Sequence, residues 1–396
     1  MPTTVADELA HWLRLASIPG LGASRQRDLL AAFGLPQHVF GAGRSALAAV
    51  VGRELADALL AAPDTEAIER GLAWAQAPGN HILTLADEAY PRSLLDIADP
   101  PALLYVKGQP ALLQRNGIAL VGARSATAQG MANAEAFARA LAEHGFAVVS
   151  GLALGIDAAA HRGALAAGPE GGGTVAVIGT GIDRIYPARN AELAREIATD
   201  GAVVSEFPLG TPPLQHNFPR RNRLIAGLAQ GVLVVEAAVN SGSLITARLA
   251  TESGREVYAI PGSIHSPLSR GCHRLIREGA KLVETAEDIF EELRGRLGLP
   301  APARSAATGT AHGGKRRARS TSKSTRPTPP AEHAQQALEL DAEAARVLAL
   351  VGHDPVDIDT LAGQAGLTVD ALYAILLPLE LDGLLAKRPG GRFQRI

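Results

Sequence analysis

The sequence contains few cysteines and few aromatic residues. Its single cysteine, Cys272, excludes a disulfide framework and agrees with a reducing compartment. Aromatic residues make up 4% of the 396 residues, so few side chains are available to stack on nucleic-acid bases. No run of about 18 apolar residues occurs, and acids stand near the N-terminus where a signal peptide would be basic and apolar. We therefore expect a cytoplasmic protein that does not associate with a membrane.

The sequence also lacks an excess of positive charge. Its 38 lysines and arginines face 40 aspartates and glutamates, which gives a net charge of −2. This balance excludes a globally basic coat for nucleic acids, so any site for a polyanion must be local. The length and the hydrophobic content of 47% are sufficient for two or three domains with sizeable cores.

Periodicity and composition divide the chain into four parts. Residues 1–80 have helical patterns, with a hairpin at Ile18–Gly22 that either presents backbone N–H groups to a phosphate or only packs. Residues 81–298 contain the main domain. Residues 299–338 are rich in Pro, Ser, Thr and Arg, which predicts a disordered basic linker. Residues 339–396 show a helix, a helix-turn-helix and a glycine-tipped hairpin, the order of a winged helix.

The main domain alternates short apolar runs with helical patterns after a bridge at His81–Leu113. This alternation predicts an α/β fold, a Rossmann-like doubly wound parallel sheet with right-handed crossovers. The predicted strands are Ile118–Gly122, Ala147–Ser150, Val175–Ile178, Ala202–Phe207, Val232–Glu236 and Glu256–Ile260. The predicted helices between them are Ala126–His144, Ile156–Ala167, Ala188–Thr199, Arg220–Ala229 and Ser243–Ser253.

The predicted helix Arg220–Ala229 carries an unusual charge pattern. Arg220, Arg221 and Arg223 crowd its N-terminus, where the helix dipole already disfavours cations. Phosphates or carboxylates are therefore expected to compensate them. Arg221 lies in line with the apolar stripe and should point inward over the carboxyl edge of the sheet. Phe218 is either a hydrophobic staple or an exposed platform for a base.

Loops rich in glycine and small hydroxyls follow the predicted strands. A ligand site in an open parallel sheet lies beyond the carboxyl ends of its strands, so these loops indicate an anion site. The first turn, GARSATAQG, is not G-x-G-x-x-G, and no acid ends the second strand. Binding of NAD is therefore not expected, and no cofactor is predicted.

Four carboxylates near the same edge raise the alternative of an enzyme. They either hold a metal for phosphodiester cleavage or pair with nearby arginines, and we favour pairing. No metal-ligand spacing of His and Cys and no G-x-S-x-G elbow occurs, so neither catalytic nor metal-binding residues are assigned. A groove with one aromatic and several arginines would bind single strands without reading sequence. The four carboxylates are Asp157, Asp183, Glu206 and Glu236.

Several ordered motifs resemble the DNA-processing protein A (DprA/Smf) family, over about Asp87 to Leu282. They are SGLALGIDAAAH, GTGIDRIYPARN, SEFP, NFPRRNRLIAGLA, VVEAAVNSGSLITA and IPGS…SRGCHRLIREGA. The flanking parts resemble a helical SAM-like N-terminal domain and a DprA-type winged helix. The resemblance implies a cytosolic homodimer that binds single-stranded DNA, protects incoming DNA and loads RecA during natural transformation.

The resemblance also implies a DNA pocket lined by the VG-x-R loop and the F-x-x-RNR helix start. These motifs correspond here to Arg124, Phe218, Arg221, Asn222 and Arg223, the last two as contacts or as scaffold. Many members have Arg where this chain has Leu154, and some have a lysine where Gln215 or His216 stands, so a less cationic pocket is expected. Location near the strand ends adds four candidates, namely Ser125, Arg220, Ser243 and Arg248.

Two alternatives remain from the sequence. Some enzymes of the same broad Rossmann-like group hydrolyse nucleotides, but their PGG-x-GT-x-x-E loop is missing here. In the winged helix, the second helix of the helix-turn-helix, TVDALYAILLPLELDG, lacks Arg, Lys, Asn and Gln to read base edges. We therefore favour a protein contact or a structural role for this domain over sequence-specific DNA reading.

Overall fold

The computed structural model describes residues 5–297, 342–352, 355–388 and 391–395. The predicted basic linker, 299–338, lies outside these residues. The predicted boundaries between the four parts of the chain stay predictions.

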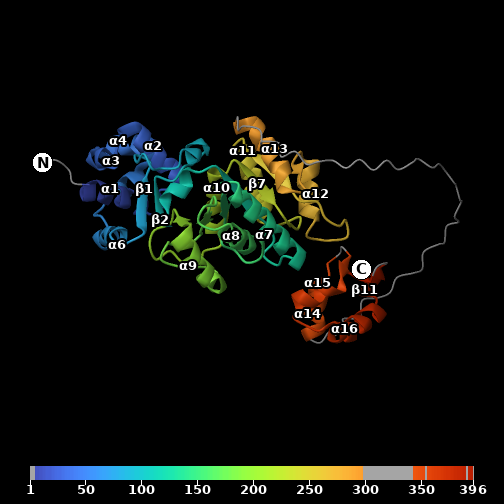
Figure 1. The fold of residues 1–396 in the computed structure, drawn as a ribbon. Coiled ribbons are helices and arrows are strands. Elements are labelled where there is room, and N and C mark those ends of the chain that lie inside the picture. The colour runs from blue at the N-terminus through green and yellow to red at the C-terminus, as the bar shows by residue number, and fades with distance from the viewer. Residues whose placement is uncertain (1–4, 298–341, 353–354, 389–390, 396) are drawn as a thin grey trace.

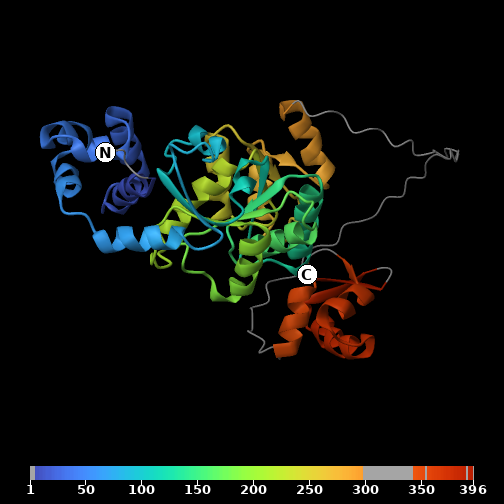
Figure 2. The same cartoon turned by 60° about the vertical axis from the view of Figure 1, so that its left-hand side comes forward.

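The N-terminal part is helical, as predicted, and lies at one end of the sheet beside its first strands (Figures 1 and 2). Its own core is built by Leu15, Leu29 and Leu47 among others, while Trp12 and Leu13 pack onto the sheet domain. The short helix α3 was not predicted, because its six residues are too few for a clear period. The helices are α1 Val5–Ser17, α2 Ala23–Phe33, α3 Pro36–Gly41, α4 Arg44–Val51, α5 Arg53–Leu60 and α6 Thr65–Ala75.

The central sheet has the strand order β1-β2-β6-β5-β4-β3-β7-β8-β9. In this spatial order, each strand from β6 onward is parallel to its neighbour, through β5, β4, β3, β7 and β8 to β9. This arrangement confirms the Rossmann-like fold. The valine-rich strands are buried on both faces, as expected for parallel strands between helices. The strands are β1 Asn80–Thr84, β2 Leu103–Gly108, β3 Gly117–Val121, β4 Ala147–Ser150, β5 Thr174–Val177, β6 Ala202–Ser205, β7 Gly231–Val234, β8 Glu256–Ala259 and β9 Lys281–Leu282.

Helices cover both faces of the sheet. Side chains of α10, α11 and α12 share one core with the strands, and those of α7, α8, α9 and α13 build the cores of the other face. The helices are α7 Ala128–Glu143, α8 Ile156–Ala166, α9 Ala191–Asp200, α10 Asn217–Leu228, α11 Ser243–Glu252, α12 Arg270–Arg277 and α13 Ala286–Leu297.

The region His81–Leu113 is more ordered than the predicted bridge. It contains β1 and β2, which pair antiparallel with each other, and β2 continues antiparallel onto β6. The prolines at Pro91 and Pro100–Pro101 dominate the local pattern and conceal two short strands between turn signals. The sheet is therefore mixed, with an antiparallel strand next to its parallel part.

The strand order reverses between β3 and β7. From β3 the chain proceeds to β4, β5 and β6 on one side, and then crosses through α10 to β7 on the other. The loops that leave the carboxyl ends of β3 and β7 consequently diverge and open a crevice between them.

The C-terminal part is a winged helix, as predicted. Its core contains Leu361, Leu372, Leu376 and Phe393, and the strands pair in the order β10-β12-β11. Among the described residues no single helix has the length and apolar composition to cross a membrane, although the bent pair α15 and α16 meets both criteria together. The elements are α14 Ala342–Leu350, β10 Val356–Asp357, α15 Ile358–Ala365, α16 Val369–Leu381, β11 Leu385–Arg388 and β12 Arg392–Arg395.

Candidate nucleic-acid interface

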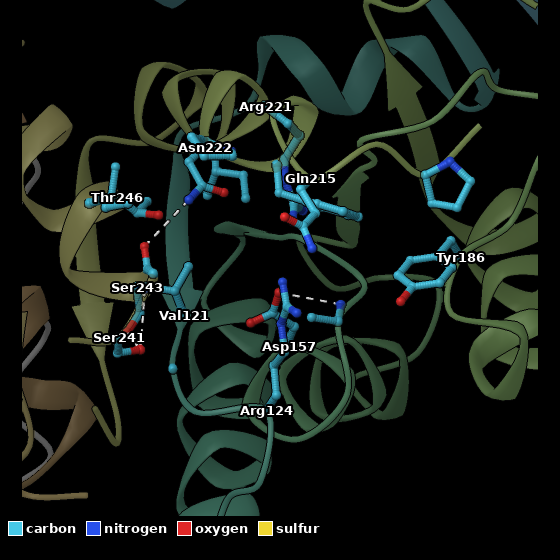
Figure 3. Close-up of a pocket in the computed structure, with 18 residues that line it drawn as sticks. Val121, Arg124, Asp157, Tyr186, Gln215, Arg221, Asn222, Ser241, Ser243 and Thr246 are labelled. Carbon is cyan, nitrogen blue, oxygen red and sulfur yellow. Dashed lines mark hydrogen bonds between the residues drawn. The ribbon is translucent and has the colours of Figure 1, made fainter. Parts of the chain in front are cut away.

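A cleft of about 690 Å³ lies at the carboxyl edge of the sheet, where the strand order reverses. Its walls come from the loops after β3, β4 and β5, from the start of α10 and from the turn before α11. Figure 3 shows Asn222 and Ser243 on one side of this cleft and Tyr186 on the other. Five predicted site residues line it: Arg124, Phe218, Arg221, Asn222 and Ser243.

The loop that carries Arg124 is fixed by close backbone contacts. The amide of Ile156 donates to the carbonyl of Ala123 at 3.2 Å, so the start of α8 lies directly against the loop. Gly155 permits this approach, because its φ is +74° and a Cβ there would lie 2.3 Å from the oxygen of Ala123. The position of Arg124 beside the cleft therefore depends on glycine at position 155, where no larger residue fits.

Arg124 lies over an aromatic pair. Its guanidinium carbon is 5.6 Å from the ring centroid of Phe218, within the range of a cation–π contact. The ring of Tyr186 lies 5.8 Å from that of Phe218 and is 47% exposed. Within the described ranges no carboxylate forms an ion pair with Arg124, which is exposed to solvent. The cleft therefore combines an exposed cation that has no direct ion pair among the described residues with an accessible aromatic surface.

Arg221 forms the floor of the cleft. It points inward, as predicted, but only 4% of it is exposed, and its Nη1 donates to the carbonyl of Val177 at 2.6 Å. Asp157 lies close to the same nitrogen, because both side chains pack against Gly151. A Cβ added to this glycine would lie 1.9 Å from Nη1 of Arg221 and 2.7 Å from Oδ2 of Asp157. Arg221 therefore lies buried at the base of the cleft, next to Asp157.

Burial and mutual attraction have opposite effects on these two charges. Burial lowers the pKa of Arg221 to about 10, and the Asp157 carboxylate opposes this shift. Burial also raises the pKa of Asp157, against the effect of Arg221 and of the amides of Ala153 and Gly151. Arg221 thus stays protonated at neutral pH, and attraction between the two groups opposes the effect of burial on both.

Arg223 lies outside the cleft. Its side chain is buried and pairs with the carboxylate of Glu206 and, at 3.1 Å, with that of Asp99. Its Nη1 also donates to the backbone carbonyl of Asp99 at 2.7 Å. Of the two roles that the sequence left open, the structure supports scaffold: Arg223 joins α10 to the segment before β2.

Three further candidates also lie away from the cleft. Arg220 is exposed, 5.4 Å from the ring of Phe207, and lines a second cleft beside the N-terminal hairpin. Arg248 is exposed on α11 and pairs with Glu252 at 3.5 Å. Ser125 is exposed in the turn after Arg124 and is not part of the lining. Ser125 and Arg248 therefore do not line the cleft, and their contact with DNA stays a prediction.

The helix start explains why the arginines separate. Helix α10 begins at Asn217, three residues before the predicted start, so Phe218 is inside the helix, Arg220 ends its first turn, and Arg221 and Arg223 lie beyond that turn. Steps of about 100° per residue then place Arg220 and Arg223, three residues apart, on one side of the helix near Glu206 and direct Arg221 to another side. The three arginines therefore do not form one cationic cluster.

Polar side chains line the wall opposite Tyr186. The hydroxyls of Ser241 and Ser243 lie 2.7 Å apart, and Nδ2 of Asn222 donates to the carbonyl of Gly242 at 3.4 Å. These contacts connect α10 to the start of α11. Because Asn222 and Ser243 also line the cleft, their remaining donor capacity is directed to the cleft.

The sequence did not assign three residues that shape the site. Tyr186 and Gln215 line the cleft, and Asn190 holds its β4 loop by donating to the carbonyls of Leu152 and Ala153 at 2.9 and 3.1 Å. Leu152 needs this support because its φ is +59°. The position of Tyr186 in a strand-end loop was a signal for it. Asn190 has no comparable signal, because its partners are almost 40 residues away.

The four carboxylates considered for catalysis each have a separate structural contact. Asp157 lies beside Arg221, and Glu206 pairs with Arg223. Asp183 accepts from the amide of Gly210 at 2.8 Å. Glu236 accepts from the amide and hydroxyl of Thr127 at 2.9 and 2.5 Å. Among the described residues, no group of three or more His, Cys, Asp or Glu side chains is arranged to hold a metal ion.

The contacts of Glu236 predict a stability effect. Replacing Glu236 with alanine removes the acceptor for two donors at the start of α7, which we expect to destabilise the fold by about 2 kcal/mol. Urea unfolding of the variant measures this change. An unaltered unfolding midpoint, or magnesium-dependent loss of a labelled oligonucleotide that needs Glu236, would contradict the structural role.

Comparisons with known proteins agree with these features. Residues 81–294 match the family described as DNA recombination-mediator protein A, and residues 329–391 match the DprA winged helix domain. The chain is 39% identical to protein Smf of Escherichia coli over 82% of this chain and 80% of the relative. It is 34% identical to protein Smf of Synechocystis over 98% of this chain and 99% of the relative.

A solved structure shares both sequence and fold with the chain. The X-ray structure of DNA processing protein A from Streptococcus pneumoniae superposes with a TM-score of 0.63 at 38% identity. The match covers 74% of this chain and 99% of that one. The sequence motifs, the mixed Rossmann-like sheet and the winged helix thus agree with the comparisons, and the chain belongs to the DNA-processing protein A (DprA/Smf) family.

Proposed function

We propose that the cleft under α10 binds single-stranded DNA without reading its sequence. The observation that carries this proposal is the exposed Arg124, without an ion pair among the described residues, over Phe218 and next to the exposed ring of Tyr186. Arg124 suits a backbone phosphate, and Tyr186 offers a face on which any base stacks. A duplex keeps its bases stacked internally, so it cannot use this surface in the same way.

The remainder of the lining supports binding that ignores sequence. Asn222 and Ser243 contribute amide and hydroxyl donors next to glycine backbone, a composition suited to phosphate and sugar contacts. One exposed aromatic stack contributes about 1–3 kcal/mol, and each phosphate neutralised on a single strand adds a salt slope of about −0.7. We expect moderate affinity that falls steeply with salt.

We further propose that the protein is a recombination mediator and not an enzyme. It would protect incoming single strands in the cytoplasm and load RecA onto them, in keeping with the recombination-mediator family to which it belongs. The separate contacts of the four carboxylates support a binding role. RecA strand exchange on DNA already covered by single-strand-binding protein tests the loading step, and no stimulation by this protein would contradict it.

Self-association is part of the same proposal. We propose a homodimer formed through the sheet domain, since two copies would present two clefts to one strand and raise avidity. Light scattering on the full chain tests this. A monomer mass at all concentrations that support DNA binding would contradict it.

Electrophoretic mobility shifts test the proposed activity directly. A labelled single strand and the duplex of the same sequence are compared with and without magnesium. We expect a shift of the single strand at lower protein concentration than the duplex, with no cleavage in either condition. Preference for the duplex would overturn the proposal, and magnesium-dependent cleavage would overturn its non-enzymatic part.

Removing residues 339–396 should leave most of the single-strand affinity. The described part of α16 has no Arg, Lys, Asn or Gln, and its exposed side chains include Tyr373, Leu377 and Leu381. We expect a change of less than about threefold, since the cleft contacts are retained. Fluorescence anisotropy of the truncated chain measures this, and a collapse of binding would move the main site to the winged helix.

A further inference from the structure

A second cleft, of about 590 Å³, lies between the N-terminal hairpin and the sheet domain. Residues 16–26, which span the hairpin and the start of α2, form one wall, and Glu206, Phe207, Pro208 and Arg220 form the other. The walls are fixed to each other, because Arg27 donates to the carbonyl of Ala98 at 2.6 Å and Trp12 packs among sheet residues. The cleft is therefore part of the folded structure.

The hairpin wall is suited to an anion. Helix α2 has eleven residues and begins after Gly22, which provides no side-chain cap. The first bond along the helix joins the amide of Gln26 to the carbonyl of Gly22, so the amides of residues 23–25 have no partner within the described chain. Free amides together with the helix dipole favour a phosphate at this position.

Positive side chains reinforce this preference. Arg25 and Arg220 line the cleft and are both exposed. The acids beside them, Asp99 and Glu206, are already paired with Arg223. Counting Arg223 together with the two lining arginines, three guanidinium groups are opposed by two carboxylates. The excess charge around the cleft is therefore positive.

Glu206 indicates that the ligand is more than an anion. Its side chain is 5% exposed, one oxygen pairs with Arg223, and the other oxygen, Oε1, has no hydrogen-bond partner. A buried acceptor without a partner is costly, and Glu206 lines this cleft. A ligand that fits has an anionic group for the hairpin and an N–H donor for Glu206. A nucleotide has both, in its phosphate and in the edge of its base.

We propose that this cleft is a second subsite for the same single strand, holding one nucleotide with its phosphate on the hairpin and its base edge at Glu206. The inference rests on the proposed function of the first cleft. The two sites are adjacent, because Pro219 lines the first and Arg220 lines the second. A strand that leaves Phe218 therefore crosses the beginning of α10 and enters the second cleft.

The variant Gly22→Asp tests the phosphate contact. Gly22 has an extended backbone with φ of −71°, and a Cβ there meets nothing within 4 Å, so aspartate fits and caps α2. Its carboxylate occupies the amides that the phosphate needs. We expect a higher melting temperature and about tenfold weaker binding of an oligonucleotide of about 16 nucleotides.

Gly43→Asp is the matched control. Gly43 precedes α4 with φ of −75°, also has no side-chain cap and has free space for a Cβ, but it does not line the second cleft. We expect binding within twofold of the wild-type chain. Equal affinities of both variants and the wild type would overturn the second subsite. If Arg124→Glu weakens binding in the same assay, the first cleft stands; if it does not, the proposed function itself fails.

Glu206→Gln tests the base contact separately. The glutamine oxygen should face Arg223, which places its NH₂ group where Oε1 was and replaces the acceptor with a donor. We expect about fivefold weaker binding with the fold retained, as judged by circular dichroism. Unchanged affinity of the folded variant would overturn the base contact. If this variant does not fold, Gly22→Asp still decides the existence of the subsite.

Discussion

Replacing Arg124 with glutamate should weaken single-strand binding at least tenfold and leave the fold intact. The side chain is exposed and has no ion pair among the described residues, so its reversal breaks only the cation–π contact with Phe218. It does put a negative charge beside Phe218, where a phosphate is proposed to lie. A tenfold loss corresponds to about 1.4 kcal/mol, a plausible loss for one phosphate contact replaced by repulsion.

Fluorescence anisotropy with a salt titration measures this effect. Arg162→Glu on α8 is the control, because Arg162 is also exposed but does not line the cleft. The neutral variant Arg124→Gln should reduce the salt slope by about 0.7, the value for one phosphate on a single strand. Equal affinity and equal slope in Arg124→Glu and Arg162→Glu would remove Arg124 from the site.

Replacing Arg221 with glutamate should destabilise the whole domain. The guanidinium is buried beside Gly151 and close to Asp157, so the variant brings a second carboxylate next to a buried one. Loss of one partner from a buried pair of charges costs about 3–5 kcal/mol. This is a large part of the stability of an ordinary domain. Loss of DNA binding by this variant would consequently report unfolding and not a phosphate contact.

Thermal unfolding of Arg221→Glu next to Arg220→Glu tests this explanation. The two changes are adjacent in sequence and alter the charge equally, but Arg220 is exposed. We expect the Arg220 variant to unfold within about 1 kcal/mol of the wild type, as surface substitutions usually do. A folded Arg221→Glu with the wild-type midpoint would show that the charge is not buried as described.

Local patterns were sufficient to predict much of the fold. The valine-rich strands, the helices between them and the winged helix follow from periodicity and turn residues. The strand-end rule also located the cleft, since it depends only on the order of parallel strands. The antiparallel strands β1 and β2 were missed because short strands among prolines have too few residues to show a period.

The roles of individual arginines were harder to predict because they depend on distant partners. The inward direction of Arg221 follows from its place on the apolar stripe of α10. Its neighbour Asp157 comes from another helix, and the pairing of Arg223 with Asp99 joins residues 124 positions apart. No local pattern encodes such contacts. They hold Arg223 in the scaffold, whereas Arg124 has no ion pair among the described residues and stays exposed beside the cleft.

Hydrogen–deuterium exchange of the full chain, with and without a single-stranded oligonucleotide, tests the central claim most directly. The proposed cleft predicts slower exchange on binding in three segments, residues 121–127, 213–222 and 241–246, which line it or adjoin it. Protection confined to the winged helix, with these segments unchanged, would contradict the assignment of the single-strand site to the strand-end cleft.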